Sequence, residues 1–462
     1  MIEILEYTGI WYLPNNLNNQ LAGTLVFEPD KEIYLNLTGD FNQFSIDLAK
    51  EEIILGFTTT GKKISLVKCY CTNRSGSFPG ILTTRYKAHY VFEGAHFLTI
   101  NEIKFYKLSS QITKLEEWVN VFGRKLKFTE GMKEFNYDFK TPECISFNIN
   151  DNLKGGFYFY YKQAFESLAF SKIEQVTSLE LSVDGEEMYN VFLGYLSHFN
   201  SFVTLGVFEA TYIKEIEFFS KTILNELNNG LKYEMPVKLY YVQKHKNHAI
   251  LKRHFHEFLF NYKQIESDFE TIIKKWYLLK DSISPVLNDL LFTFSNKEVF
   301  TENRFLDVVR ALEIYHRRIK ENNEKLLKEF KFTLDPILDL LDENQRNWIS
   351  EKLEYKYEPS LRKRLKELFK EFSIQPLTNI VISKSDLKEL INKTTISRNY
   401  YTHYNVDLKK DAYHGMDLYV LSEKLIILLI IIILRETGFE NNEIETLFKE
   451  KEYDYFNHIM KK

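Results

Sequence analysis

Residues 394–407 read TTISRNYYTHYNVD and hold an arginine, an asparagine and a histidine close together. Asn399 follows Arg398 directly, and His403 comes five residues after the arginine. Cleaving RNA without a metal requires three events: the ribose 2′-OH loses a proton, the charge on the phosphorane is stabilised, and the 5′-oxygen gains a proton. Histidine moves protons near neutral pH, and arginine binds phosphate through a fork of donors. These residues could therefore cleave RNA, with Asn399 adding a neutral hydrogen bond.

The spacing of Arg398 and His403 does not suit one straight helix. Five residues at roughly 100° each leave the two side chains about 140° apart. Both could reach one phosphate if the helix ends or bends within residues 400–403, or if two copies of the motif meet across a dimer axis. Spacing alone leaves a second interpretation open, in which Arg398 and His403 are favourable cations near a helix C-terminus and the tyrosines are packing residues.

The elements that must position these residues change in character along the chain. Short alternating segments fill the first half, and in EIYLNLT the side chains of Ile33, Leu35 and Leu37 share one face. From about residue 251 the pattern is helical, with an apolar stripe at three- and four-residue spacing in residues 305–319. We therefore predict an α+β multidomain protein, in which a β-rich, sandwich-like N-terminal half precedes an α-helical bundle.

Four segments are expected in this chain. Residues 1–125 and 126–242 are predicted to form two β-rich modules, 243–299 a helical connector, and 300–462 the bundle. The run LIILLIIIIL, Leu425–Leu434, is apolar on all sides. Because its ten residues are well short of the roughly 20 that span a bilayer, we expect a buried core helix and no membrane span.

The composition excludes a bulk polyanion binder but not a local basic site, because 44% of residues are hydrophobic and the net charge is −4. Three cysteines without a secretory leader indicate a reducing cytoplasm. Cys69 and Cys71 would point to one face of a strand and lack the second pair that zinc needs.

The histidines between residues 245 and 256 are interpreted as a polar hinge. No phosphate loop, HExxH pair or GxSxG elbow occurs, so neither a cofactor nor a metal site is predicted.

Both ends of the sequence resemble known families. The string RNYYTH, followed by a very apolar helix, resembles the R-x4-6-H signature of the HEPN ribonuclease superfamily, and FLDVVRALEIYHRR (Phe305–Arg318) resembles the earlier HEPN helix with its ALE core. GIWYLPNNLNNQLAGTLVFEP (Gly9–Pro29) is similar to the opening of the large N-terminal domain of ApeA-type anti-phage proteins, which precedes a C-terminal HEPN domain. Together the resemblances cover almost the whole chain.

The resemblance implies a homodimer that brings two R-x4-6-H motifs into one composite cleft. It also implies metal-independent RNA cleavage to a 2′,3′-cyclic phosphate, within prokaryotic defence by abortive infection. Carried over to this sequence, Arg398 would hold the phosphate, His403 would transfer protons, and Asn399 would be the polar partner. Glu313, in the ALE string, could anchor Arg398 or His403, or be a solvated helix residue. Some members have a tyrosine two places after the histidine, where this chain has Asn405, which argues against a mechanism that depends on that tyrosine.

Other residues near the motif could bind the substrate. Basic clusters at residues 316–318 and 362–366 could contact phosphates or simply form a solvated face. Tyr404, with Tyr400 and Tyr401, could stack unpaired bases, and packing in the core or at a dimer interface is an equal alternative for the latter two.

The N-terminal half carries no catalytic signature, and we hypothesise that it senses a phage-derived trigger or restrains the nuclease. The expected substrate is RNA, with structured RNA such as tRNA expected from the family. The main alternative is a non-catalytic HEPN-fold protein that binds RNA, nucleotide or a partner. A carbohydrate- or protein-binding β-sandwich with a helical oligomerisation tail is a third, but it leaves RNYYTH without a role. The presence of both Arg398 and His403 favours the enzyme.

Overall fold

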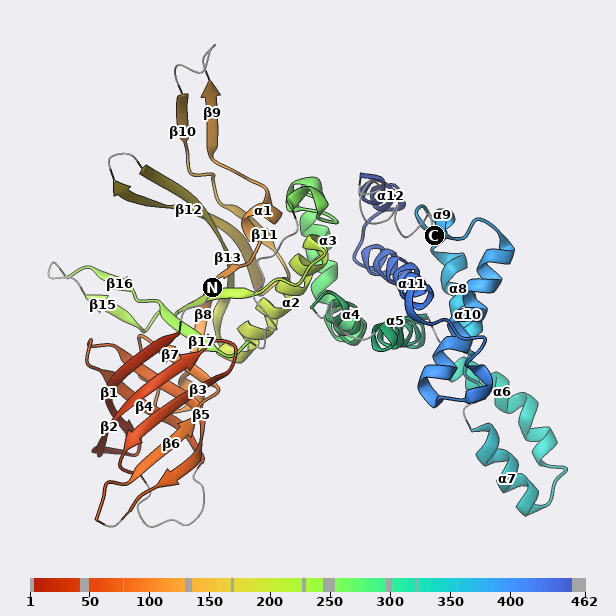
Figure 1. The fold of residues 1–462 in the computed structure, drawn as a ribbon, viewed down its shortest axis with the longest axis horizontal. Helices are drawn as coiled ribbons and strands as arrows, with labels where there is room; N and C mark the ends of the chain where they lie inside the picture. The colour runs from red at the N-terminus through yellow and green to blue at the C-terminus, as the bar shows by residue number, and fades with distance from the viewer. Residues whose placement is uncertain are drawn as a thin grey trace. The chain divides into compact units, whose positions relative to one another are not determined.

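The computed structural model describes residues 4–41, 50–77, 79–128, 135–167, 170–226, 230–243, 254–295, 301–320, 323–354 and 356–450. The chain divides into two compact units, Met1–Glu270 and Thr271–Lys462. The first unit consists mainly of strands and the second of helices (Figure 1). The predicted order of a β-rich half followed by a helical bundle is therefore confirmed.

Six strands of the N-terminal unit close on themselves. They are β1 (Leu5–Leu13), β2 (Asn16–Glu28), β3 (Glu32–Thr38), β4 (Lys50–Thr58), β5 (Lys63–Ser75) and β6 (Thr83–Lys87). The antiparallel order is β5-β4-β1-β2-β3-β6, and β6 also pairs with β5, which completes the ring. Ile33, Leu35 and Leu37 point into its core, as their alternation predicts, while Tyr34 does not.

The core of this ring is built around Trp11. The Trp11 indole is fully buried and donates a hydrogen bond to the Gly23 carbonyl (3.0 Å). A Cβ atom at Gly56 would lie 2.3 Å from the Trp11 ring, so the packing requires glycine there. Cys69 and Cys71 point into the same core, as predicted. Burial raises the pKa of the Cys69 thiol, which keeps it protonated.

Beyond the ring the same sheet continues in the order β11-β12-β13-β8-β14-β17-β7-β5, so the sandwich-like half expected from the sequence takes the form of one continuous sheet. The added strands are β7 (Tyr90–Glu93), β8 (Lys104–Ile112), β11 (Ile145–Asn148), β12 (Leu153–Ser167), β13 (Phe170–Met188), β14 (Ile213–Phe219) and β17 (Val237–Tyr241). Two hairpins pair separately: β9 (Arg124–Phe128) with β10 (Phe135–Phe139), and β15 (Leu224–Glu226) with β16 (Lys232–Glu234).

Two helices pack against this part of the sheet. They are α1 (Leu115–Val119) and α2 (Tyr189–Val207), which contact β13, with α2 also contacting β8. Trp118 of α1 is fully buried, with ring centroids 6.2, 6.3 and 5.8 Å from those of Phe157, Phe199 and Phe202. Aromatic side chains from strands and helices thus form a second core next to the closed ring.

The domain boundaries expected from the sequence are corrected. β8 lies in the expected module 1–125, yet it pairs with β13 and β14 of the expected module 126–242. β7 likewise pairs with β17. Because strands far apart in sequence satisfy one another's backbone hydrogen bonds, the two segments form one unit. Residues 243–299 are not a separate connector, since the division falls between Glu270 and Thr271.

The second unit is a helical bundle around one core helix. Its helices are α3 (Phe269–Leu278, which begins just before the division), α4 (Lys280–Ser295), α5 (Thr301–Tyr315), α6 (Asn323–Leu338), α7 (Glu343–Leu353), α8 (Leu361–Glu371), α9 (Leu377–Ile380), α10 (Lys384–His403), α11 (Gly415–Glu436) and α12 (Asn441–Glu450). Every residue of Leu425–Leu434 in α11 is at most 1% exposed, which confirms the predicted core helix. Within the described ranges, no helix has the length and apolar character needed to cross a membrane.

Candidate active site

Helix α10 carries the whole arginine–histidine motif. Its start is fixed by a capping box, in which Asp386 N donates to Ser383 Oγ (3.2 Å) and Ser383 N donates to the Asp386 carboxylate (2.9 Å). The helix continues through Arg398 and has His403 as its last residue. Tyr404 then adopts a left-handed conformation with φ of 48°, which ends the helix. The motif therefore lies in the last turns of α10.

The motif residues form a polar strip along one side of α10. At roughly 100° per residue, Thr402, Asn399 and His403 lie about 40°, 100° and 140° around the helix from Arg398. All four are half-buried or exposed, whereas Tyr401 is buried. The angle of about 140° between Arg398 and His403 thus persists in the structure, because α10 remains helical up to His403. Arg398 and His403 stand at the two borders of this strip.

Glu313 of α5 lies beside Arg398. Its Oε2 is 3.6 Å from Arg398 Nη2, and Arg398 Nη1 donates to Asn399 Oδ1 (3.4 Å). The Arg398 and Glu313 side chains are 33% and 27% exposed, so the pair is accessible from solvent. A guanidinium has five N–H donors, and these contacts leave donors for a phosphate.

The tyrosines of the motif separate into buried and exposed ones. The Tyr401 hydroxyl lies 3.0 Å from the Tyr413 carbonyl, and burial raises its pKa to about 12. Tyr401 therefore stays protonated at neutral pH and serves packing. Tyr404 is 66% exposed and its ring centroid is 5.7 Å from that of the half-buried Tyr400. In the chain, Tyr404 directly follows the exposed His403 and Tyr400 precedes it by three residues.

The loop after the motif is fixed to α10 by residues that sequence reasoning missed. His414 is the N-cap of α11, with Nδ1 2.7 Å from the Tyr401 hydroxyl and Nε2 2.9 Å from the Lys409 carbonyl. Tyr413 N donates to Ser397 Oγ (2.9 Å). The only sequence signal for His414 is its place directly before a glycine and the apolar helix.

The two basic clusters are largely engaged within the bundle. His316 is buried, with Nε2 2.7 Å from the Glu367 carboxylate. Arg364 is only 3% exposed. Both alternatives from the sequence, a phosphate contact and a solvated face, are therefore wrong for these two, because neither side chain reaches solvent. The exposed members of the second cluster are Arg362, Lys363 and Lys366.

The other candidate ligand groups do not assemble into a site. In the part of the chain that the structure describes, no three His, Cys, Asp or Glu side chains gather so as to hold a metal ion. His254 caps the short helix Phe255–Glu257, and His256 lies within it. His245 and His248 lie outside the described residues.

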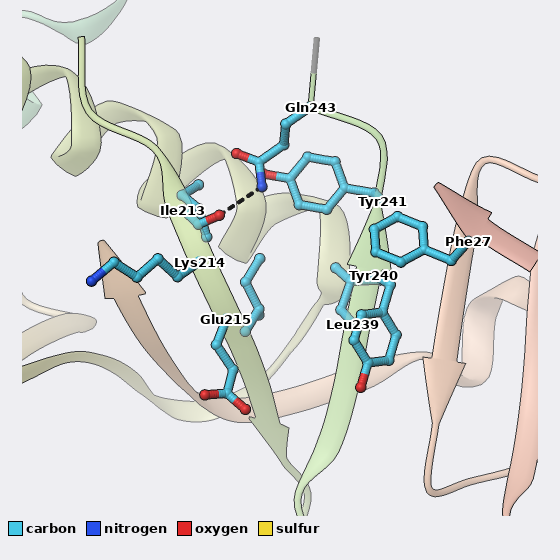
Figure 2. A pocket seen from close by; sticks show the side chains of 9 residues that line it. Phe27, Ile213, Lys214, Glu215, Leu239, Tyr240, Tyr241 and Gln243 are labelled. Carbon is cyan, nitrogen blue, oxygen red and sulfur yellow. Dashed lines mark hydrogen bonds between the residues drawn. The ribbon is translucent and has the colours of Figure 1, made fainter. Parts of the chain in front are cut away.

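The N-terminal unit has a small pocket where its sheet splits (Figure 2). β17 pairs with β14 only at Val237 and Lys238, and the two strands then separate. Gln243 Nε2 donates to the Ile213 carbonyl across the gap (2.8 Å; Figure 2). The lining is mostly aromatic and aliphatic, with Lys214 and Glu215 as its charged members.

Comparisons with known proteins follow the same division of the chain. A family model described as ApeA N-terminal domain 1 matches residues 6–276, more than half of the chain. A second model, described as Apea-like HEPN, matches residues 306–443 and so includes most of α5 and all of α10 and α11. No curated protein and no solved structure matches the chain.

Proposed function

Because the chain belongs to the ApeA family, with an ApeA N-terminal domain followed by an ApeA-like HEPN domain, we propose that it is a metal-independent endoribonuclease. In this reaction the ribose 2′-oxygen attacks the adjacent phosphorus, the bond to the 5′-oxygen breaks, and a 2′,3′-cyclic phosphate remains. The proposed setting is prokaryotic anti-phage defence by abortive infection, with cellular RNA such as tRNA as substrate. The observation that carries the proposal is Arg398, held 3.6 Å from Glu313 on the polar strip that ends at His403.

Three residues of the strip, and Tyr404 after it, have roles that their chemistry supports. The Arg398 guanidinium would bind the non-bridging oxygens and stabilise the charge that develops on them. The exposed His403 imidazole would transfer a proton to or from a ribose oxygen near neutral pH. Asn399 would donate a neutral hydrogen bond to the phosphate, and its contact with Arg398 would keep the two side chains together. Tyr404 would stack a base beside the scissile bond.

A second copy of the chain would supply what one strip lacks. The reaction removes one proton and delivers another, and each strip holds one histidine. Exposed side chains adjoin the motif, with Tyr404, Val406 and Met416 at 66%, 78% and 61% exposure. Exposed apolar groups of this kind favour association. We infer a homodimer in which two strips face each other across a two-fold axis, so that Arg398 and His403 of different copies act on one phosphate.

The N-terminal unit is proposed to sense a phage-derived ligand or to hold the nuclease inactive. It is a separately packed unit with its own buried cores, which suits a module that responds to a signal. The pocket of this unit is lined mostly by aromatic and aliphatic side chains, as ligand-binding pockets commonly are, which supports a sensing role.

The test is cleavage of tRNA and of single-stranded RNA by the purified full-length protein in EDTA. We expect cleavage to persist and the fragments to end in a 2′,3′-cyclic phosphate. His403→Ala should slow the reaction by about 100-fold or more, since a positioned acid or base contributes roughly 10²–10⁴-fold. His256→Ala, which removes an exposed histidine from the other unit, should cleave at the wild-type rate.

Loss of cleavage in EDTA would rule out the metal-free mechanism, and equal rates for His403→Ala and wild type would remove the histidine from the site. The same variants expressed in phage-infected cells, with growth arrest as the readout, cover the case in which cleavage requires a phage signal. A wild type that binds RNA without cleaving it or arresting growth would favour the non-catalytic alternative.

A further inference from the structure

Helix α5 changes from α-helical to π-helical geometry shortly after Glu313, the residue that pairs with Arg398. The α-helix ends at Tyr315, and His316–Lys320 form a π-helical turn. Such turns are rare, and they occur frequently at functional sites. Glu313 lies two residues before the end of the α-helix. The position of its carboxylate therefore depends on how this junction is held.

Arg364 of α8 holds the junction. Its Nη1 donates to the Glu313 carbonyl (3.3 Å), its Nε donates to the Pro359 carbonyl (2.9 Å), and its Nη2 pairs with the Glu358 carboxylate (3.3 Å). The Glu358 carboxylate also pairs with Arg317 Nη2 (2.5 Å). One buried guanidinium thus binds the backbone of Glu313 directly and the π-helical turn through Glu358. A side chain that bonds to helix carbonyls is a recognised cause of a local change in helical geometry.

We propose that Arg364 is a positioning residue for Arg398. It fixes the backbone of Glu313, and the Glu313 carboxylate in turn orients the Arg398 guanidinium toward the phosphate. The effect on cleavage rests on the proposed function. Only arginine suits this place, because its planar fork reaches three acceptors at once whereas a lysine ammonium offers a single point charge.

The structure also supplies a control for a merely structural role. His316 pairs with Glu367 (2.7 Å) and Lys320 pairs with Glu371 (2.6 Å). Both side-chain contacts join the π-helical turn to α8 without involving Glu313. If Arg364 only joins α5 to α8, removing one of these two contacts should affect cleavage as much as replacing Arg364 does.

The first experiment measures kcat and KM of full-length Arg364→Gln, Arg364→Lys and Glu367→Gln on one RNA. Arg364→Gln should lower kcat by about 10-fold or more with little change in KM, because misplacing a reacting group by roughly 1 Å can lower the rate by up to about 100-fold. Arg364→Lys should recover part of the loss. Glu367→Gln should keep the wild-type kcat, and an equal loss in this variant would overturn the proposal.

The second experiment completes a double-mutant cycle with Glu313→Gln. Arg364→Gln should lower kcat in the wild-type background and by less than about 2-fold in the Glu313→Gln background, because both changes act through one contact chain. Equal losses in the two backgrounds would overturn the proposal.

A third measurement separates this proposal from the proposed function. A cycle of Arg364→Gln and Arg398→Ala in the free energy of unfolding should show coupling between the two residues. If the wild type neither cleaves RNA nor arrests the growth of phage-infected cells, the proposed function fails, while this coupling still decides whether Arg364 positions Arg398. Additive effects on unfolding would remove the positioning role.

Discussion

Two arginine–glutamate pairs connect α5 to neighbouring helices, and their surroundings differ sharply. Glu313 joins α5 to α10 through Arg398, with 3.6 Å between Nη2 and Oε2 and side chains 27% and 33% exposed. Arg304 joins α5 to α11 through Glu423, with 2.5 Å between Nη2 and Oε1 and side chains 17% and 0% exposed. Arg304 also lies over the Tyr419 ring, 5.6 Å from its centroid. The first pair is loose and accessible, and the second is close and buried.

This difference separates the candidate site from the elements that position it. An ion pair in contact with water contributes little to stability, because solvent competes for both charges. Arg398 can therefore exchange part of its contact with Glu313 for a phosphate at small cost in free energy. A buried pair depends on both partners, since removal of one leaves an uncompensated charge. Arg304 and Glu423 thus fix α5 on the core helix, and α5 in turn presents Glu313.

The largest expected effect is on stability at the buried pair. At pH 8, where the Glu423 carboxyl is ionised, Glu423→Ala should lower the free energy of unfolding by about 3–5 kcal/mol, because Arg304 is left without its counter-charge. Glu313→Ala should lower it by less than about 1 kcal/mol. Urea unfolding of the full-length protein, followed by helical circular dichroism, measures both. Replacing Arg304 and Glu423 together by methionine should recover most of the loss, and equal effects of the two alanine variants would remove the distinction between the pairs.

A smaller expected effect is that the contribution of Glu423 to the free energy of unfolding depends on pH. Burial raises the pKa of Glu423 to about 7, although Arg304 acts in the opposite direction. A carboxyl with a raised pKa holds its proton more tightly in the folded state, so its contribution to stability is complete below the unfolded pKa and is lost as pH rises toward 7. The unfolding free energy of wild type minus that of Glu423→Gln should fall by up to about 3 kcal/mol between roughly pH 4 and pH 8, at about 1.4 kcal/mol per pKa unit. A difference that stays constant over this range would contradict the assignment.

The helical core could be predicted because its pattern admits one interpretation. A run apolar on all sides, Leu425–Leu434, is too short for a bilayer and fits only a buried helix. The stripe that includes Phe305, Val308 and Leu312 likewise indicates one buried face of α5. Closure of the sheet could not be predicted, since the pairing of β3 with β6 and of β8 with β14 depends on strands that are distant in sequence. The expected boundary at residue 125 was wrong for this reason.

The candidate site could be predicted where residue type and spacing carry chemistry. For Arg398 and His403 the spacing alone leaves a packing interpretation open, and the resemblance of RNYYTH to the HEPN signature makes them site candidates; the structure places both on the last turns of α10. Arg364 and Glu423 could not be distinguished from solvated charges, because Arg364 lies in the basic string RKRLK and Glu423 in LSEKL. Their roles come from burial against α5, which is a property of the packed bundle.

We propose that Arg398 acts on the phosphate and is not a structural cation. The direct test is the rate of RNA cleavage by full-length Arg398→Ala in EDTA, at a temperature where its circular dichroism equals that of wild type. We predict cleavage at least about 100-fold slower, as expected when a charge-stabilising donor is lost, with the free energy of unfolding changed by less than about 1 kcal/mol. Cleavage at the wild-type rate, or a loss of activity that only follows a loss of folded protein, would show that Arg398 does not act on the phosphate.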